Sequence, residues 1–112
     1  MLIAATTVHA FAQDVKEMHE QGKAYIRQGD YSNAILVLRR ATAIEPSNIE
    51  LSKDLSLSHY FNNDHQAALT VIKPVIERDD ADEQSFLIAA VYVHNRIVTK
   101  ALFEQVSYNQ YW

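Results

Sequence analysis

Residues 22–46 constrain the fold most strongly, because two apolar stripes of helical period flank a single break. Apolar residues spaced three or four positions apart form one face of a helix, so each stripe predicts an amphipathic helix. The break is Gly29-Asp30, a residue that tolerates positive φ followed by one that caps helix starts, and Pro46 closes the segment. The segment therefore predicts an antiparallel helix pair. The apolar stripe of the first helix begins just before this segment, with Met18, and continues through Gly22, Tyr25 and Ile26. The stripe of the second helix comprises Ala34, Ile35, Leu38, Ala41 and Ile44.

The same pattern recurs further along the chain. A helix pair this short cannot bury its own apolar face, so further copies are expected, and a shift of about 34 residues aligns a second one. The aligned pairs are Asp30 with Asp64, Ala34 with Ala68, Ile35 with Leu69, Val37 with Val71, and Glu45 with Asp79. Most other residues differ, as in stacked structural repeats. From Glu83 a third unit continues the first-helix pattern through Phe86, Ala89, Ala90 and Val93.

These residues resemble the tetratricopeptide repeat (TPR) family. With Val15 as the first position of a repeat, five residues match the family's signature: Gly22, Tyr25, Ala34, Ala41 and Pro46. Met18 and Leu38 replace the usual tryptophan and phenylalanine. The resemblance implies an all-α fold, in which antiparallel helix pairs stack as a short right-handed superhelix (an α-solenoid) of two and a half to three repeats. Their expected bounds are about 15–48, 49–82 and 83–112, within a helical domain of residues 13–112.

The first 12 residues have two interpretations. They are apolar, carry no charged side chain, and end in Ala10-Phe11-Ala12, an A-x-A pattern that signal peptidase accepts. This interpretation predicts export, in a bacterial setting to the periplasm, with Gln13 as the mature terminus. The alternative is an N-terminal arm that caps the first repeat of a cytoplasmic protein. No segment reaches the roughly 20 apolar residues of a membrane span.

Composition argues against several classes of function. The net charge of -4 gives no electrostatic case for nucleic acid, and without cysteine there is no disulfide, thiol nucleophile or thiolate metal site. The acidic turn 79–83 lacks the glycine and the distal glutamate of a calcium loop. No catalytic motif is present, and the five histidines fall on different elements. We therefore expect no enzyme activity, cofactor or metal.

The resemblance also implies where a partner binds, since the first helix of each TPR pair lines a concave groove. A surface with a basic first part and an apolar, aromatic floor suits a protein or peptide segment with acidic residues at one end and aliphatic anchors at the other. Alternatively, a neighbouring helix covers the apolar residues. Asp54 would repel a terminal carboxylate, which argues against the C-terminal tails that some TPR proteins bind. The positions are Lys16, His19, Lys23, Ile26 and Arg27 in the first repeat, Glu50, Lys53, Leu57, Tyr60 and Phe61 in the second, and Gln84, Leu87, Val91, His94 and Asn95 in the third.

Two functional hypotheses follow. The first is a non-enzymatic interaction module, adaptor or chaperone-like, which binds a peptide or helical segment in this groove; a small secretion-system chaperone is a variant of it. The second is a structural role, as part of a longer array or as a homodimer that pairs through the C-terminal unit, because the chain ends in the apolar, aromatic residues Tyr111 and Trp112. Solenoids need polar surfaces at their ends, so an aromatic end predicts a covering partner.

Overall fold

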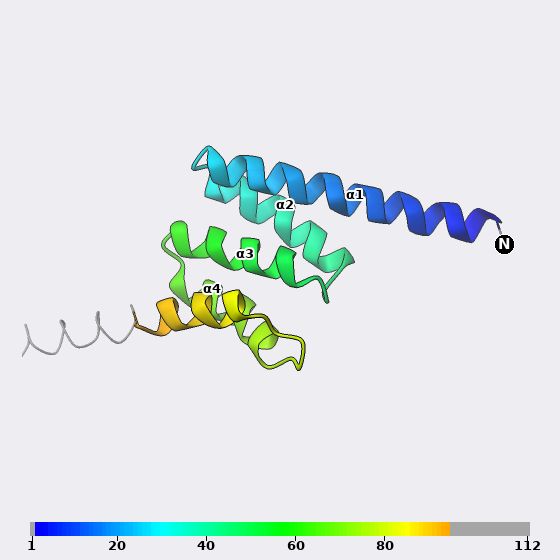
Figure 1. Cartoon of the computed structure of the whole chain (residues 1–112). Helices are drawn as coiled ribbons and strands as arrows, with labels where there is room; N and C mark the ends of the chain where they lie inside the picture. Colours follow the sequence, from blue (N-terminus) through cyan, green and yellow to red (C-terminus); the bar gives the residue numbers. More distant parts are fainter. Residues whose placement is uncertain (1, 95–112) are drawn as a thin grey trace, which may run out of the picture.

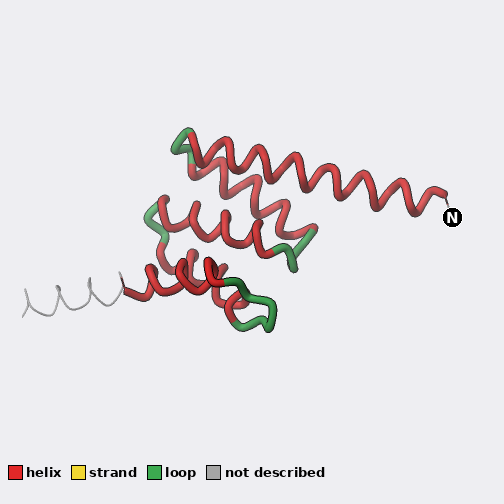
Figure 2. Tube along the Cα trace, viewed as in Figure 1, coloured by secondary structure: helices red, strands yellow, loops and turns green. Residues whose placement is uncertain are grey.

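The computed structural model describes residues 2–94, with side chains from residue 14 onward. Within residues 2–94, five helices follow one another: α1 (Leu2–Arg27), α2 (Tyr31–Ile44), α3 (Ile49–Phe61), α4 (His65–Ile76) and a fifth over residues 83–94, called the 83–94 helix below (Figure 1). Short turns join them, and no strand occurs between residues 2 and 94 (Figure 2). The all-α prediction is confirmed.

The helices pack as antiparallel pairs in a stack. α1 packs on α2, α3 packs on α4, and α2 contacts α3, so that the second pair lies directly against the first (Figure 1). The 83–94 helix continues the stack beside α4. The first helices of the successive units, α1, α3 and the 83–94 helix, form one face of the molecule, which we call the first-helix face. The predicted arrangement of a TPR-like solenoid is confirmed over the described residues, whereas the segment expected to form the second helix of the third unit lies outside them.

The turn between α1 and α2 and the turn between α3 and α4 use the same backbone geometry, 34 positions apart. Gly29 has φ +75° and Asn63 has φ 63°, a left-handed conformation that glycine and asparagine tolerate best. In each turn the next residue caps the following helix: the Asp30 carboxylate accepts from Asn33 N, and the Asp64 carboxylate accepts from Ala67 N. The hydrogen bonds that close the two turns also correspond. Asp30 N donates to Tyr25 O and Asp64 N donates to His59 O, both at 2.9 Å. The repeat in the sequence therefore corresponds to a repeated pattern of turn-closing and capping hydrogen bonds.

Two apolar clusters hold the stack together. The first cluster joins α1 and α2 to α3, and the second joins α4 to the 83–94 helix. Gly22 of α1 lies directly against the Leu38 side chain of α2. The buried members are Val15, Ala34, Ile35, Leu38, Ala41, Leu51 and Leu55 in the first cluster, and Ala68, Ile72, Val75, Ile88, Ala89 and Tyr92 in the second.

The N-terminal segment continues α1 without a break. Its backbone is helical from Leu2, and it extends away from the other helices rather than folding back over the first repeat (Figure 1). Removal of residues 1–12 remains a prediction. In the part of the chain that the structure describes, every helix is either too short or too polar to cross a lipid bilayer.

Candidate protein-binding groove

An apolar groove of about 240 Å³ lies between α3 and the 83–94 helix. It includes six of the residues expected to contact a partner: Leu57, Tyr60, Phe61, Gln84, Leu87 and Val91. Stacking of the second and third units brings these side chains together from two helices that are consecutive first helices of the array. We call this feature the apolar groove. Its complete lining is Leu57, Tyr60, Phe61, Gln84, Leu87, Ile88, Val91 and Tyr92.

The lining residues divide into a buried floor and an exposed rim. Tyr92 and Ile88 are buried, and Leu57 and Tyr60 pack partly buried against the same cluster. By contrast, Leu87 is 58% exposed, and Phe61 and Val91 are each 49% exposed. Large apolar side chains half exposed beside one groove mark a surface that is suited to covering by another apolar group.

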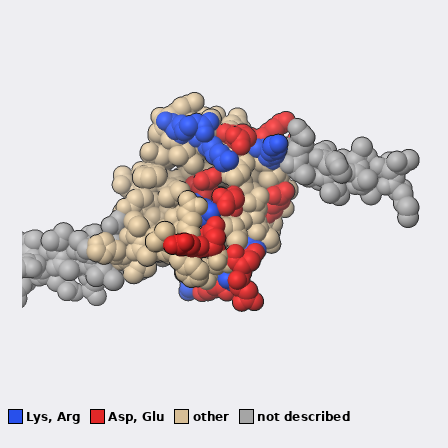
Figure 3. Space-filling model, in the orientation of Figure 1, with Lys and Arg blue, Asp and Glu red and all other residues tan. Residues whose placement is uncertain are grey.

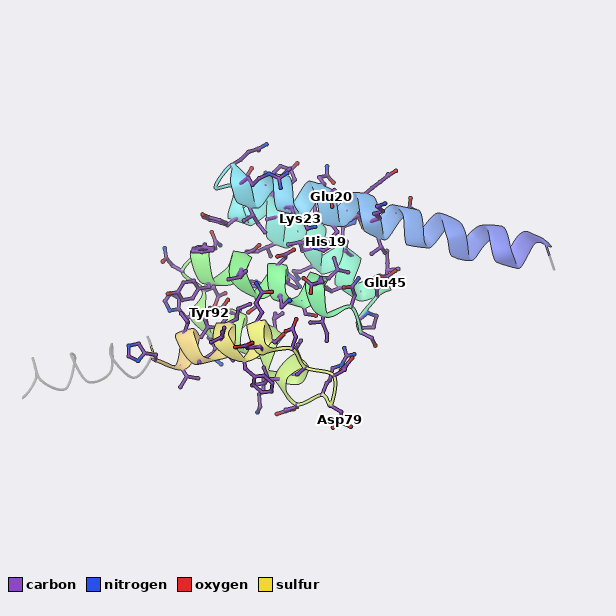
Figure 4. The ribbon with its side chains drawn as sticks, viewed as in Figure 1. His19, Glu20, Lys23, Glu45, Asp79 and Tyr92 are labelled. Atoms are coloured by element: carbon purple, nitrogen blue, oxygen red, sulfur yellow. The ribbon has the colours of Figure 1, made fainter. Side chains whose placement is uncertain are left out.

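Stacked aromatic rings support one end of the apolar groove. The Tyr60 ring lies 4.7 Å from the Tyr92 ring and 4.8 Å from the His65 ring, and it meets Phe61 edge-on at 5.6 Å. Phe61 in turn stacks on Tyr31 at 5.4 Å, which connects α3 to the start of α2. Figure 4 shows the labelled Tyr92 between α3 and the 83–94 helix. Because each ring is packed against another, the floor is preformed.

Tyr92 is anchored from below by a polar contact. Its hydroxyl lies 3.3 Å from Ser56 Oγ, and the Ser56 hydroxyl donates to the Ala68 carbonyl at 2.7 Å. Burial raises the pKa of Tyr92, so the phenol stays neutral. Ser56 stands where the first repeat has Gly22, and its hydroxyl uses that position to join α3, α4 and the 83–94 helix.

Lys53, expected to face a partner, is instead buried in a network of ion pairs and hydrogen bonds. Its side chain is only 4% exposed, and its ammonium donates to Glu50, Asp82 and Gln84, each at 2.8 Å. Burial alone would lower the pKa of Lys53, but the hydrogen bonds to Asp82 and Glu50 outweigh it and raise the pKa. The charge of Lys53 is thus neutralised within the chain, because stacking brings the N-cap of the 83–94 helix against α3.

The expected basic residues of α1 occupy varied surroundings. His19 Nε2 lies 2.6 Å from Asp54 Oδ2 and joins α1 to α3, while Lys23 pairs with Glu20 at 3.3 Å on its own helix. Lys16 and Arg27 are exposed, and Ile26 packs partly buried against the first cluster. Figure 4 shows His19, Glu20 and Lys23 together on α1. These residues lie apart from the apolar groove, and so does the exposed His94. Asn95 lies outside the described residues.

Comparison with known proteins agrees with this geometry. A tetratricopeptide repeat model matches residues 25–90, more than half of the chain. The chain belongs to the TPR family. No curated protein and no solved structure gave a significant match.

TPR repeats generally mediate protein–protein interaction and are typically non-enzymatic, so membership points to a protein partner. Among residues 14–94, no group of three or more histidine or carboxylate side chains is arranged to hold a metal ion. Sequence reasoning missed Tyr92 and Ile88 as the floor of the apolar groove. Their burial could have been predicted from the sequence, because Ser85, Ile88 and Tyr92 are spaced three and four residues apart and so lie on one face of the helix.

Proposed function

We propose that this TPR protein binds an apolar segment of a partner protein in the apolar groove, as an adaptor or chaperone-like module. The observation that carries the proposal is the half-exposed rim of Leu87, Val91 and Phe61 above a preformed aromatic floor. Rigid aromatic and aliphatic surfaces of this kind form the centres of protein interfaces. A small secretion-system chaperone would use the same groove in the same way.

The size of the apolar groove sets the expected affinity. A volume of about 240 Å³ accepts one or two large side chains of a partner. Burying one leucine- or phenylalanine-sized side chain contributes about 1.5–3 kcal/mol, so two anchors contribute about 3–6 kcal/mol before ordering costs. Such a groove supports weak, exchangeable binding unless further contacts add to it.

Matched surface substitutions test the proposal. Phe61→Ser and Leu87→Ser should each reduce the capture of partners from an extract of the source organism, because both side chains belong to the rim. Leu36→Ser is the control, since Leu36 is 59% exposed on α2, away from the groove. Circular dichroism of all three variants checks the fold. Equal capture by the groove variants and the wild type would refute the groove assignment.

Self-association is a second candidate, favoured by the apolar end of the stack. A larger groove of about 650 Å³ lies between α4 and the 83–94 helix, lined in part by Leu69, Ile76 and Val93. Phe86 and Val93 are half exposed on the same helix. A second copy could cover this end. Light scattering at high micromolar concentration tests it: a monomer would count against a homodimer. The C-terminal residues Tyr111 and Trp112, expected to contribute, lie outside the described residues.

Export is proposed from the A-x-A pattern at residues 10–12. The intact mass of the protein, isolated from fractionated cells, tests it. A chain that begins at Gln13 in an exported fraction supports processing, whereas a chain that retains residues 1–12 in the cell interior contradicts it.

A further inference from the structure

The polar network around Lys53 adjoins the apolar groove and gives it a charge. Gln84 belongs to both, since it lines the groove while its Oε1 accepts from the Lys53 ammonium at 2.8 Å. Glu50 and Lys53 precede Leu57 on the same helix, by about two turns and about one turn. The groove therefore runs from this network, where α3 and the 83–94 helix begin, to the aromatic rings near the end of α3.

The network carries more negative than positive charge. One ammonium, that of Lys53, faces two carboxylates, those of Glu50 and Asp82. The Lys53 side chain is buried, so it offers no positive surface, whereas the Glu50 side chain is 63% exposed. Glu83, next to Asp82 in the chain, is also exposed. A partner that passes over this end meets carboxylates rather than the lysine expected from the sequence.

The space-filling view agrees with this distribution. Figure 3 shows acidic side chains over the region where α3 and the 83–94 helix begin, an uncharged region towards the other ends of these helices, and a mixture of basic and acidic side chains over α1. On the part of the first-helix face that holds the apolar groove, the charge is acidic and confined to one end.

We infer that the partner segment carries an apolar anchor followed, about 10 Å away, by a lysine or arginine that lies over Glu50 and Asp82. The inference rests on the proposed binding in the apolar groove and specifies the chemistry of that partner. The spacing follows from the positions of Glu50 and Leu57, which are seven residues apart and therefore separated by about 10 Å along the helix. An extended segment covers that distance in about three residues, and a helical one in about seven.

Charge complementarity is the reason for the cation. An exposed ion pair contributes modestly, so one lysine should improve binding by up to about fivefold, and its replacement by glutamate should weaken binding by about tenfold or more. Opposite charges facing each other also raise the rate of association and exclude partners of the wrong sign. The apolar groove supplies the anchor site, and the carboxylates select the orientation of the segment.

Three types of synthetic peptide, each made in both chain directions, test the inference by fluorescence anisotropy with the full chain. Each carries a leucine and a phenylalanine as anchors, and about three residues away it carries a lysine, a glutamine or a glutamate, in either chain direction. The lysine peptide should bind most tightly and the glutamate peptide most weakly. The difference should shrink in high salt, because exposed charges are screened.

A charge reversal on the protein gives the decisive comparison. Glu50→Lys should reverse the preference, so that the glutamate peptide becomes the tighter ligand. Glu77→Lys, at the C-cap of α4, makes the same change of net charge away from the apolar groove and should alter neither affinity. An unchanged preference in Glu50→Lys would overturn the inference. If all three peptides bind equally and Leu87→Ser abolishes that binding, only the charge selection fails. If no peptide binds, the proposed function fails with it.

Discussion

Replacing Gly22 by alanine should destabilise the protein, although alanine is the better helix former. A Cβ at Gly22 would lie 2.6 Å from Leu38 Cδ2 and 2.7 Å from Leu38 Cγ, well inside van der Waals contact. Leu38 is completely buried in the first cluster, so its side chain has no solvent into which to move. Two effects therefore oppose each other in Gly22→Ala: a gain in helix propensity and a steric penalty.

The magnitudes decide the sign. Alanine gains about 1 kcal/mol over glycine in a helix interior, whereas overpacking a filled core costs about 1–3 kcal/mol. The expected net loss in the free energy of unfolding is about 1 kcal/mol, within a range of about 0–2 kcal/mol. For a domain of this size, 1 kcal/mol corresponds to a fall in Tm of about 4–8 °C.

Urea unfolding followed by circular dichroism measures this loss. Ala24→Gly, two residues further along α1, gives the propensity difference in the same helix. In the background of Leu38→Ala, which alone should cost about 2–5 kcal/mol, Gly22→Ala should become neutral or stabilising because the new methyl group meets a cavity. A Gly22→Ala variant more stable than the wild type, by the amount that Ala24→Gly loses, would refute the close contact.

Three further predictions concern the turns and the titrating groups. Gly29→Ala should lower the free energy of unfolding by about 1–2 kcal/mol because φ is +75°, although no atom lies within 4 Å of the new Cβ. Gly29→Asn should lower it less, because Asn63 adopts the equivalent turn. Equal losses of stability in thermal melts would contradict this. The hydrogen bond from Lys53 holds the pKa of Asp82 below its usual range, so the Asp82 carboxylate stabilises the fold above about pH 4, and this stabilisation is lost as the pH falls through the folded pKa. Asp82→Asn should therefore reduce the dependence of the free energy of unfolding on pH in the acid range. An unchanged dependence would refute the Lys53–Asp82 interaction. Burial lowers the pKa of His59, so the free energy of unfolding should fall as the pH drops below about 6.5. His59→Gln should remove this fall. If the fall persists in the variant, another group causes it.

The helix pairs could be predicted from the sequence because their signals are local. Gly29-Asp30 combines a residue for the left-handed turn with a helix cap, and both act through bonds to residues no more than five positions away. Asn63-Asp64 forms the same turn and helix cap, with asparagine in place of glycine at the left-handed position. A repeat therefore remains recognisable when most side chains differ, since the hydrogen bonds need only a residue that accepts positive φ and a short acceptor side chain.

The candidate site was predictable only in part. Leu57, Tyr60 and Phe61 on α3, with Leu87 and Val91 on the next first helix, could be assigned to one face through the TPR resemblance, and they line one groove. Their binding of a partner stays a prediction. The partner of Lys53 could not be assigned in the same way, since Asp82 is 29 residues away and their contact depends on how far successive units are offset.

Lysine is ordinarily exposed, and a Lys53 read as an isolated residue would supply a positive surface. Its burial becomes favourable only when stacking provides two carboxylates and an amide oxygen at once.

Polar contacts between units favour the observed relative position of successive helix pairs along the stack. His19 and Lys53 stand 34 positions apart in the sequence. His19 contacts Asp54 on the next first helix, and Lys53 contacts Asp82, which caps the next first helix. Breaking the Lys53–Asp82 pair would leave a buried charge without its partner, so this pair strongly disfavours any other relative position of the two units. The width of the apolar groove depends on the distance between α3 and the 83–94 helix. The Lys53 network thus sets the geometry of the groove with the same groups that give one end its negative charge.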